Sequence, residues 1–116
     1  MNSRNLFEYD LEFTIPGQHR EAFEEWRPQA TCRWGLDDNV VWFDEQHNDT
    51  GIGPECRYVF GFESLQAWAG FVEGTAHSEN MESLQELADT VRATLWQPTQ
   101  PSMETMTQPS VGRSRS

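Results

Sequence analysis

The sequence predicts an α+β domain in which the elements follow the order strand, helix, strand, strand, helix, strand. Two observations lead to this prediction. One is the unbroken alternation of apolar and polar residues in LFEYDLEFTI, residues 6–15. The other is a pair of aromatic-rich segments on either side of the loop NDTGIGP, residues 48–54, which is typical of an antiparallel hairpin.

The first predicted strand has one apolar face and one acidic face. Every second residue from Phe7 to Ile15 is apolar. Between them lie the carboxylates of Glu8, Asp10 and Glu12. A period of two is the pattern of a strand that covers a core on one side. Three carboxylates in succession on the other side either meet water or line a site.

A short amphipathic helix is predicted in PGQHREAFEEW, residues 16–26. The Pro-Gly pair ends the strand, and proline is common in the first turn of a helix. Ala22, Phe23 and Trp26 recur at helical spacing. We expect this helix to end near Pro28, with QATCRWGLDD as the connection to the next strand.

Two strands are predicted around the loop at residues 48–54. NVVWFDEQH, residues 39–47, and ECRYVFGFE, residues 55–63, are rich in β-branched and aromatic residues. The loop holds Asn, Asp, two Gly and a Pro in seven positions, which favours a turn. An antiparallel hairpin is therefore expected here.

A second helical region and a last strand complete the order. Ser64 is a good N-cap for SLQAWAGFVEG, where Trp68 and Phe71 lie at helical spacing. We expect GTAHSEN, residues 74–80, to interrupt the helix and MESLQELADTV to resume it. TVRATLWQP, residues 90–98, is expected to be a strand because it is crowded with β-branched residues and Trp.

This order is that of the ferredoxin-like split βαβ arrangement. It gives a four-stranded antiparallel sheet with both helices on one face. We expect the domain to span residues 1–98. Residues 99–116 are rich in Ser, Thr, Gln and Pro, and we expect them to form a disordered tail or to dock on a partner.

Composition argues against several classes of function. A chain of 116 residues suits one domain with a modest core and no disulfide staples. Its formal net charge of −11 disfavours binding to nucleic acid or to anionic membranes. No apolar run approaches the ~20 residues of a membrane span, and a secretory signal is not recognisable. We therefore expect a cytoplasmic protein with Cys32 and Cys56 as free thiols.

The sheet face away from the helices is predicted to hold both charges and large aromatic side chains. If the apolar side of the first strand meets the helices, its carboxylates share the other side with Arg92 and Trp96. The hairpin strands carry apolar residues on both sides, with Trp42 and Phe60 among them. Such a face should be covered, and we expect a second copy of the chain to cover it, giving a homodimer. The acids would then line a cavity between subunits, with Arg92 and Arg57 as charge partners.

Three short segments carry a family resemblance. They are the strand with IPGQHREAFEEW, the hairpin that runs into YVFGFESLQAW, and FVEGTAHSENM with small residues before a His. Together they span roughly residues 6–97 and resemble the dimeric α/β-barrel proteins, in particular the antibiotic biosynthesis monooxygenase-like (ABM) domains. The resemblance implies a homodimer with facing sheets and a pocket in each subunit. It also implies small-molecule chemistry, because members include cofactor-independent oxygenases of polyketide-type aromatics, haem-degrading proteins, isomerases and cyclases.

His77, Arg92 and Asp10 are the candidate catalytic residues. An imidazole titrates near neutrality, so His77 can act as an acid or base, or it can be a capping or surface histidine. Arg92 can hold an enolate or carboxylate, or form a salt bridge to the first strand. A desolvated Asp10 can act as a base, or it can be solvated or paired with arginine.

One carboxylate and four aromatic side chains are the candidate ligand-binding residues. Aromatic rings can stack on a flat ligand, and they can equally pack in a core or a dimer contact. The set is Glu12, Trp42, Phe60, Trp68 and Trp96. The sequence has no zinc-type spacing, phosphate-cradling glycine loop or nucleophile elbow, so we expect no metal and no cofactor.

The combined prediction is a small cofactor-independent monooxygenase-like enzyme. It would act on an aromatic or polyketide-type small molecule in a pocket between sheet and helices, where a base removes a proton and the carbanion reacts with oxygen. One alternative is a non-catalytic dimeric ligand-binding or accessory protein of the same fold. Another is a cyclase or isomerase that uses the same acid/base pair without oxygen. Fold-level analogy alone does not separate these classes.

Overall fold

A computed structural model describes residues 6–99 of the chain. The strands of this part are β1 Phe7–Phe13, β2 Trp42–His47, β3 Cys56–Phe62 and β4 Val91–Trp96. The helices are α1 Arg20–Gly35, α2 Leu65–Val72 and α3 Thr75–Leu87, with the 3-10 turn η2 Gly17–His19 leading into α1. The predicted order of elements is confirmed. The predicted tail lies, beyond Thr99, outside the described residues.

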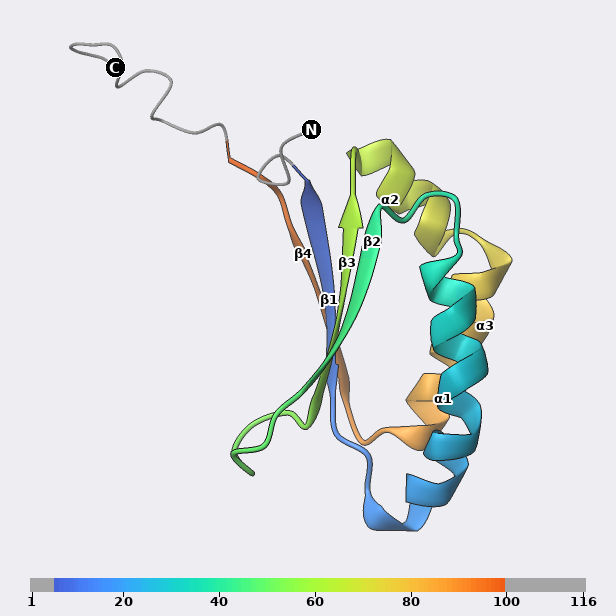
Figure 1. Cartoon of the computed structure of the whole chain (residues 1–116), viewed down its shortest axis with the longest axis vertical. Coiled ribbons are helices and arrows are strands. Elements are labelled where there is room, and N and C mark those ends of the chain that lie inside the picture. The colour runs from blue at the N-terminus through green and yellow to red at the C-terminus, as the bar shows by residue number, and fades with distance from the viewer. Residues whose placement is uncertain (1–5, 100–116) are drawn as a thin grey trace, which may run out of the picture.

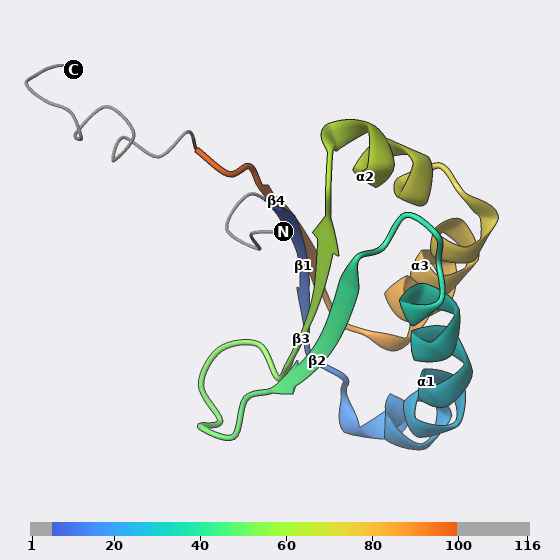
Figure 2. The ribbon, with the colours of Figure 1, turned by 45° about the horizontal axis from the view of Figure 1, so that its top comes forward.

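The four strands form one antiparallel sheet in the order β2-β3-β1-β4. All three α-helices lie on one side of it, and the other side is bare (Figure 1). Figure 2, turned by 45°, shows the same two layers. This is the ferredoxin-like arrangement that the order of elements predicts.

The alternation in β1 decides which residues meet the helices. On the helix side Tyr9 lies opposite Phe60, and Leu11 lies opposite Tyr58. All four side chains are buried. Helical residues complete this core with the buried side chains of Phe23, Trp34, Phe71 and Leu84. The predicted sidedness of the first strand is therefore confirmed.

Helix α1 is longer than the sequence predicts. It passes through Pro28 and ends at Gly35, so the predicted end near Pro28 is wrong. An interior proline costs about 3 kcal/mol. Ala30 and Trp34 lie beyond it and are 2% and 0% exposed. Burying the ~200 Å² of an indole is worth about 5 kcal/mol, which exceeds the proline penalty.

The predicted interruption at residues 74–80 is also wrong in extent. Helix α2 ends at Val72 and α3 begins at Thr75, with Gly74 in extended conformation as its N-cap. The break is therefore two residues long, and His77 lies in the first turn of α3. At the start of α2 the predicted N-cap is confirmed, because the Ser64 Oγ accepts a hydrogen bond from the Ala67 N–H at 3.0 Å.

The hairpin is confirmed, with strands shorter than predicted. β2 begins at Trp42 because the preceding residues form a turn around Asp37. The Asn39 N–H donates to its carboxylate at 2.9 Å, and the Val40 N–H donates to its carbonyl at 3.0 Å. In the loop that follows, Gly51 and Gly53 have φ of +78° and +85°, a region that favours glycine.

Candidate functional site

The sheet separates the predicted site residues into two groups. On the bare side, here called the open face, lie Asp10, Glu12, Trp42, Arg92 and Trp96. On the helix side lie Phe60, Trp68 and His77. His77 and Arg92 are thus on opposite sides of the sheet, and the idea that they form one base and anion-stabiliser pair within a chain is wrong.

Two tryptophans stand at the ends of one row across the open face. The row runs Trp42, Gly61, Glu8, Trp96 through the pairings of four adjacent strands. Trp42 lies over Gly61 so closely that a Cβ there would be 2.4 Å from the indole Nε1. Trp42 is 37% exposed and Trp96 is 58% exposed. The open face therefore presents large apolar groups at both edges.

A charge cluster occupies the middle of the open face. The Arg57 Nη2 lies 3.2 Å from the Asp10 Oδ2 and 3.3 Å from the Glu8 Oε2. Asp10 is 5% exposed. Its other oxygen, Oδ1, and the Arg57 Nε are both buried without a hydrogen-bond partner among the described residues. The predicted pairing of the acids with Arg57 is present, and it leaves two polar atoms unsatisfied.

Burial raises the pKa of Asp10 from its ordinary 3.8 to about 6. The neighbouring charge of Glu8 acts in the same direction, and the charge of Arg57 opposes it. A carboxyl of this kind changes its protonation state close to neutral pH. Glu12 lies between Arg57 and Arg92 in the register, and each of the two flanking hollows, of about 250 and 380 Å³, includes it in its lining.

His77 is part of the aromatic core. It is 5% exposed, and its Nδ1 accepts a hydrogen bond from the Trp34 Nε1–H at 3.1 Å. The rings of Phe71 and Tyr9 lie 4.5 and 5.8 Å from it, centroid to centroid. Burial lowers the pKa of His77 to about 4, with the charge of Asp37 opposing. The imidazole is therefore neutral at pH 7 and a weak base.

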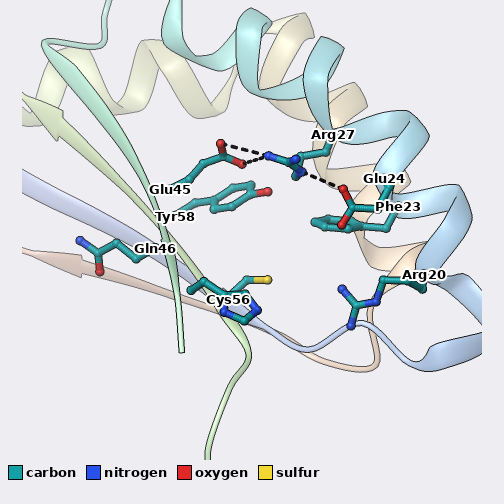
Figure 3. A pocket seen from close by; sticks show the side chains of 9 residues that line it. Arg20, Phe23, Glu24, Arg27, Glu45, Gln46, Cys56 and Tyr58 are labelled. Atoms are coloured by element: carbon teal, nitrogen blue, oxygen red, sulfur yellow. Dashed lines mark hydrogen bonds and ion pairs between the residues drawn. The ribbon is translucent and has the colours of Figure 1, made fainter. Parts of the chain in front are cut away.

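A pocket of about 230 Å³, here called the α1 pocket, opens between α1 and the strands β2 and β3 (Figure 3). Nine side chains line it, among them Arg20, Arg27, Glu45, His47, Cys56 and Tyr58. The pocket lies between sheet and helices, which is the place that the sequence analysis predicts for a substrate.

Tyr58 projects its hydroxyl toward α1 at the base of this pocket (Figure 3). The oxygen is buried and makes no hydrogen bond of ordinary geometry to the described residues, although the Glu45 carboxylate lies opposite Tyr58 on β2. Burial, aided by the charge of Glu45, raises the pKa of Tyr58 well above its usual range, so the hydroxyl keeps its proton. An unsatisfied buried hydroxyl is unfavourable, and it is available to hydrogen-bond a group that binds in the pocket.

Both guanidinium groups of the α1 pocket have carboxylate partners. The Arg27 side chain lies 3.3 Å from Glu24 and 3.3 Å from Glu45. The Arg20 Nη2 lies 2.7 Å from Glu55. The pocket wall is thus polar without a strong excess of positive charge.

His47 brings an oriented imidazole to the pocket wall. Its Nδ1 lies 2.8 Å from the Asp49 Oδ1, and its Nε2 lies 3.5 Å from the Glu55 Oε2. A carboxylate therefore lies beside each ring nitrogen, and the shorter contact, at Nδ1, orients the ring. Cys56 lies opposite His47 on β3. It is not a nucleophile, because burial raises the pKa of its thiol to about 11.

The sequence analysis did not select Tyr58, Arg27 or His47 as site residues. The available signal was the pairing of the hairpin, which puts Glu45 opposite Tyr58 and His47 opposite Cys56 on the helix side. The spacing of seven residues between Arg20 and Arg27 was the other signal, because it puts them on one side of α1.

Cys32 is exposed and Cys56 is buried, and the two are not joined by a disulfide in this structure. Within residues 6–99, no three His, Cys, Asp or Glu side chains are grouped as a metal site. In the same part of the chain, each helix is too short or too polar to cross a membrane.

Solved structures share this fold. A mutant of SnoaB, a cofactor-independent oxygenase from Streptomyces nogalater, matches with a TM-score of 0.67 and 13% identity over 84% of this chain and 96% of SnoaB. A dabb family protein of ferredoxin-like fold from Mesorhizobium loti matches with a TM-score of 0.68 and 11% identity, covering 82% of this chain and 98% of that protein.

A protein from Bacteroides fragilis, described as dimeric and ferredoxin-like, matches with a TM-score of 0.66 and 10% identity over 80% of this chain and 96% of that protein. No protein-family profile matches the sequence, and no curated protein matches it. The TM-scores of 0.66 to 0.68 establish the ferredoxin-like fold, and at identities of 10% to 13% they establish the fold alone.

Proposed function

We propose that the chain is a small homodimeric enzyme of the cofactor-independent oxygenase type, with its substrate site in the α1 pocket. The observation that carries the proposal is the buried Tyr58 hydroxyl, which faces the pocket without a partner. The shared fold with SnoaB, a cofactor-independent oxygenase, supports the reaction type. The family resemblance to ABM domains supports an aromatic or polyketide-type substrate.

The size of the pocket suits the reacting ring of such a molecule. Its volume of about 230 Å³ is below the ~300–1,000 Å³ of most ligand sites. The pocket would hold the reacting ring, and the flanking rings of a larger substrate would extend along the polar wall toward Arg20 and Arg27.

Tyr58 would act on the substrate carbonyl. Because its hydroxyl is protonated and otherwise unpaired, it can donate a hydrogen bond to a carbonyl oxygen. That bond strengthens as negative charge develops on the oxygen, so it stabilises the enolate more than the ketone. The acidity of the adjacent C–H bond rises accordingly.

His47 would act as the base. Its Nδ1 is held by Asp49, and its Nε2 would take a proton from the acidified carbon once the substrate displaces the contact of Nε2 with Glu55, 3.5 Å away. The carbanion gives electrons to oxygen and forms a hydroperoxide. Loss of water from this hydroperoxide gives a ketone, so a CH₂ group and one O₂ yield one C=O and one H₂O. The substrate supplies all of the electrons, and the reaction needs no added reductant.

The predicted residues on the helix side would support this site from behind. Trp34 packs edge-on against Tyr58 with centroids 5.9 Å apart, and it donates its indole hydrogen bond to His77. His77 is then a positioning residue, which acts through Trp34. Phe60 packs against Trp34 with ring centroids 5.4 Å apart, and Trp68 packs against Tyr9 at 5.8 Å, so both would support the core rather than touch the reacting atoms.

The predicted residues on the open face would lie in the dimer contact. Trp42 and Trp96 expose apolar surface there, and a second copy would cover it. The dimeric state of the Bacteroides fragilis protein supports this assembly. Asp10, Glu12 and Arg92 would then meet the partner subunit and not the substrate.

Oxygen uptake with an anthrone as the probe substrate tests the proposal. Anthrones are polyketide-type aromatics with an acidic CH₂ beside a ring system that carries a carbonyl. The wild type should consume oxygen without added flavin or metal, and Tyr58→Phe should reduce kcat by about 10²-fold or more. Tyr9→Phe is the matched control, because Tyr9 is the other tyrosine of the chain and lies outside the pocket lining.

A non-catalytic ligand-binding role is the second candidate. It is favoured by the pairing of both pocket arginines with glutamates, which leaves no free cation to hold an anionic intermediate. It predicts that the same anthrone binds and changes the intrinsic tryptophan fluorescence on titration. Oxygen uptake should then be no faster than that of the anthrone in buffer without protein.

A further inference from the structure

The buried charge cluster on the open face is incomplete in a single chain. Asp10 is 5% exposed, yet its Oδ1 has no hydrogen-bond partner among the described residues, and neither has the adjacent Arg57 Nε. Buried polar atoms are normally satisfied, and an unpaired buried carboxylate is strongly unfavourable. The proposed site in the α1 pocket does not involve this cluster, because it lies on the other side of the sheet.

Carboxylates outnumber guanidinium groups around Asp10. Glu8 and Glu12 flank it on β1, and Asp44 lies in its row on β2. Arg57 on β3 reaches it at 3.2 Å, whereas Arg92 on β4 lies opposite Glu12. With Asp10 ionised, the open face carries four carboxylates and two guanidinium groups. Two such faces carry net charges of the same sign, so they repel each other when they come together in a low-dielectric contact.

We infer that the proposed dimer forms through the open face with uptake of a proton at Asp10 in each chain, so that the dimer tightens as the solution becomes more acidic. This inference rests on the homodimer proposed above. Protonation of Asp10 leaves three carboxylates against two guanidinium groups and so halves the surplus negative charge of each face. The neutral carboxyl also gains an O–H that can donate to a neighbouring carboxylate, while the Arg57 guanidinium keeps Glu8 as its partner.

A second copy of the chain is the occupant that the charges of this face favour. Arg92 is exposed and forms no ion pair with the described residues, whereas the acids of the same face are in surplus. A symmetric partner brings its surplus carboxylates to Arg92, and the reciprocal contact forms at the same time. The exposed rings of Trp42 and Trp96 supply apolar area at the two edges of the same contact.

The direction of the effect follows from the titration of Asp10. Its pKa is already raised to about 6 by burial and by Glu8, and further burial in a contact raises it more. The dimer therefore binds more protons than two monomers do. One proton per chain gives at most about a hundredfold change in the dissociation constant for each pH unit.

Sedimentation velocity over a dilution series at pH 5.5, 6.5 and 7.5 tests the inference. The dimer dissociation constant of the wild type should fall by at least about tenfold from pH 7.5 to pH 5.5. Asp10→Asn, which is uncharged at every pH, should dimerise tightly at all three values. Glu8→Gln should keep the dependence with its midpoint at lower pH. Asp44→Asn is the matched control on the same face and should keep the midpoint of the wild type.

The outcomes separate the inference from the proposal on which it rests. A dimer whose dissociation constant is the same at all three pH values would overturn the proton linkage and leave the dimer standing. Retention of the full pH dependence in Asp10→Asn would also overturn it. A chain that stays monomeric at pH 5.5 at tens of micromolar would overturn the dimer itself.

Discussion

The indole N–H of Trp34 donates a hydrogen bond to the Nδ1 of His77 at 3.1 Å, and both side chains are buried. Because an N–H occupies one side of the imidazole, Nδ1 must be the acceptor and the neutral ring carries its proton on Nε2. This contact joins α1 to α3 behind Tyr58. It makes His77 a structural element of the core.

Removing the acceptor should destabilise the core. In His77→Leu the Trp34 N–H is left buried and unpaired, which should lower the free energy of unfolding by about 1–3 kcal/mol. His77→Gln keeps an acceptor oxygen on the same helix and should recover part of the loss. Urea denaturation followed by tryptophan fluorescence measures both. Equal stabilities for the Leu and Gln variants would show that the hydrogen bond contributes nothing.

Stability should depend on pH through two groups of opposite sign. Asp10 has a pKa of about 6 in the folded chain against an ordinary 3.8, so the folded state binds more protons and its contribution is lost as pH rises through 6. His77 has a pKa of about 4 against an ordinary 6.5, so its contribution is present above 6.5 and lost as pH falls toward 4. Each amounts to at most about 3 kcal/mol, and the two act in opposite directions across this pH range.

Single variants should reveal each contribution. Relative to wild type, Asp10→Asn should gain stability as pH rises from 4 to 7, by up to about 3 kcal/mol. His77→Gln should gain stability relative to wild type as pH falls from 7 to 4. Thermal unfolding across this range measures the differences. A constant offset between either variant and wild type would contradict the corresponding pKa shift.

Tyr58→Phe should leave the fold as stable as before or slightly more so. Its hydroxyl is buried without a partner, so removal loses no hydrogen bond and relieves a desolvation penalty of about 1–3 kcal/mol. Chemical denaturation of purified variants provides the test. A loss of more than 1 kcal/mol would reveal a structural partner for the hydroxyl. Unchanged stability with lost oxygen uptake would assign the hydroxyl to function.

Gly61→Ala should displace Trp42 from the sheet. A Cβ at residue 61 would lie 2.4 Å from the Trp42 Nε1, so the ring must swing outward. We expect a red-shifted tryptophan emission and a dimer weakened by about tenfold or more, because Trp42 lies in the proposed contact. Gly17→Ala is the control, since a Cβ there meets no atom within 4 Å. Identical behaviour of the two variants would contradict the packing of Trp42 on Gly61.

Much of the architecture follows from the sequence, and the site follows less well. The period of two in β1 predicts both faces of the sheet, because each residue there lies opposite a partner of the same face. Pro28 wrongly predicts the end of α1, because the burial of Trp34 six residues later outweighs the low helix propensity of proline. His77 likewise lies in helix α3 rather than in a turn, because the burial of its side chain outweighs the local preference of the small residues before it.

Whether a buried polar atom has a hydrogen-bond partner is decided by contacts between distant segments, which the sequence pattern does not show. Whether a tyrosine hydroxyl is satisfied depends on which groups the fold brings near it, and Tyr58 meets its pocket neighbours on α1 more than thirty residues away in the chain. The pattern of β3 shows only that Tyr58 faces the core. Similarly, alternation places Asp10 on the open face but does not show that one of its oxygens is unpaired.

Oxygen labelling is the most direct test of the central claim. The wild type is incubated with the anthrone under ¹⁸O₂, and the quinone product is weighed by mass spectrometry, with Tyr58→Phe and Tyr9→Phe in parallel. The account predicts one ¹⁸O atom in the product and the other in water, at a rate that Tyr58→Phe loses and Tyr9→Phe retains. Product formed at the uncatalysed rate by all three proteins, or equally fast by wild type and Tyr58→Phe, would contradict an oxygenase site in the α1 pocket.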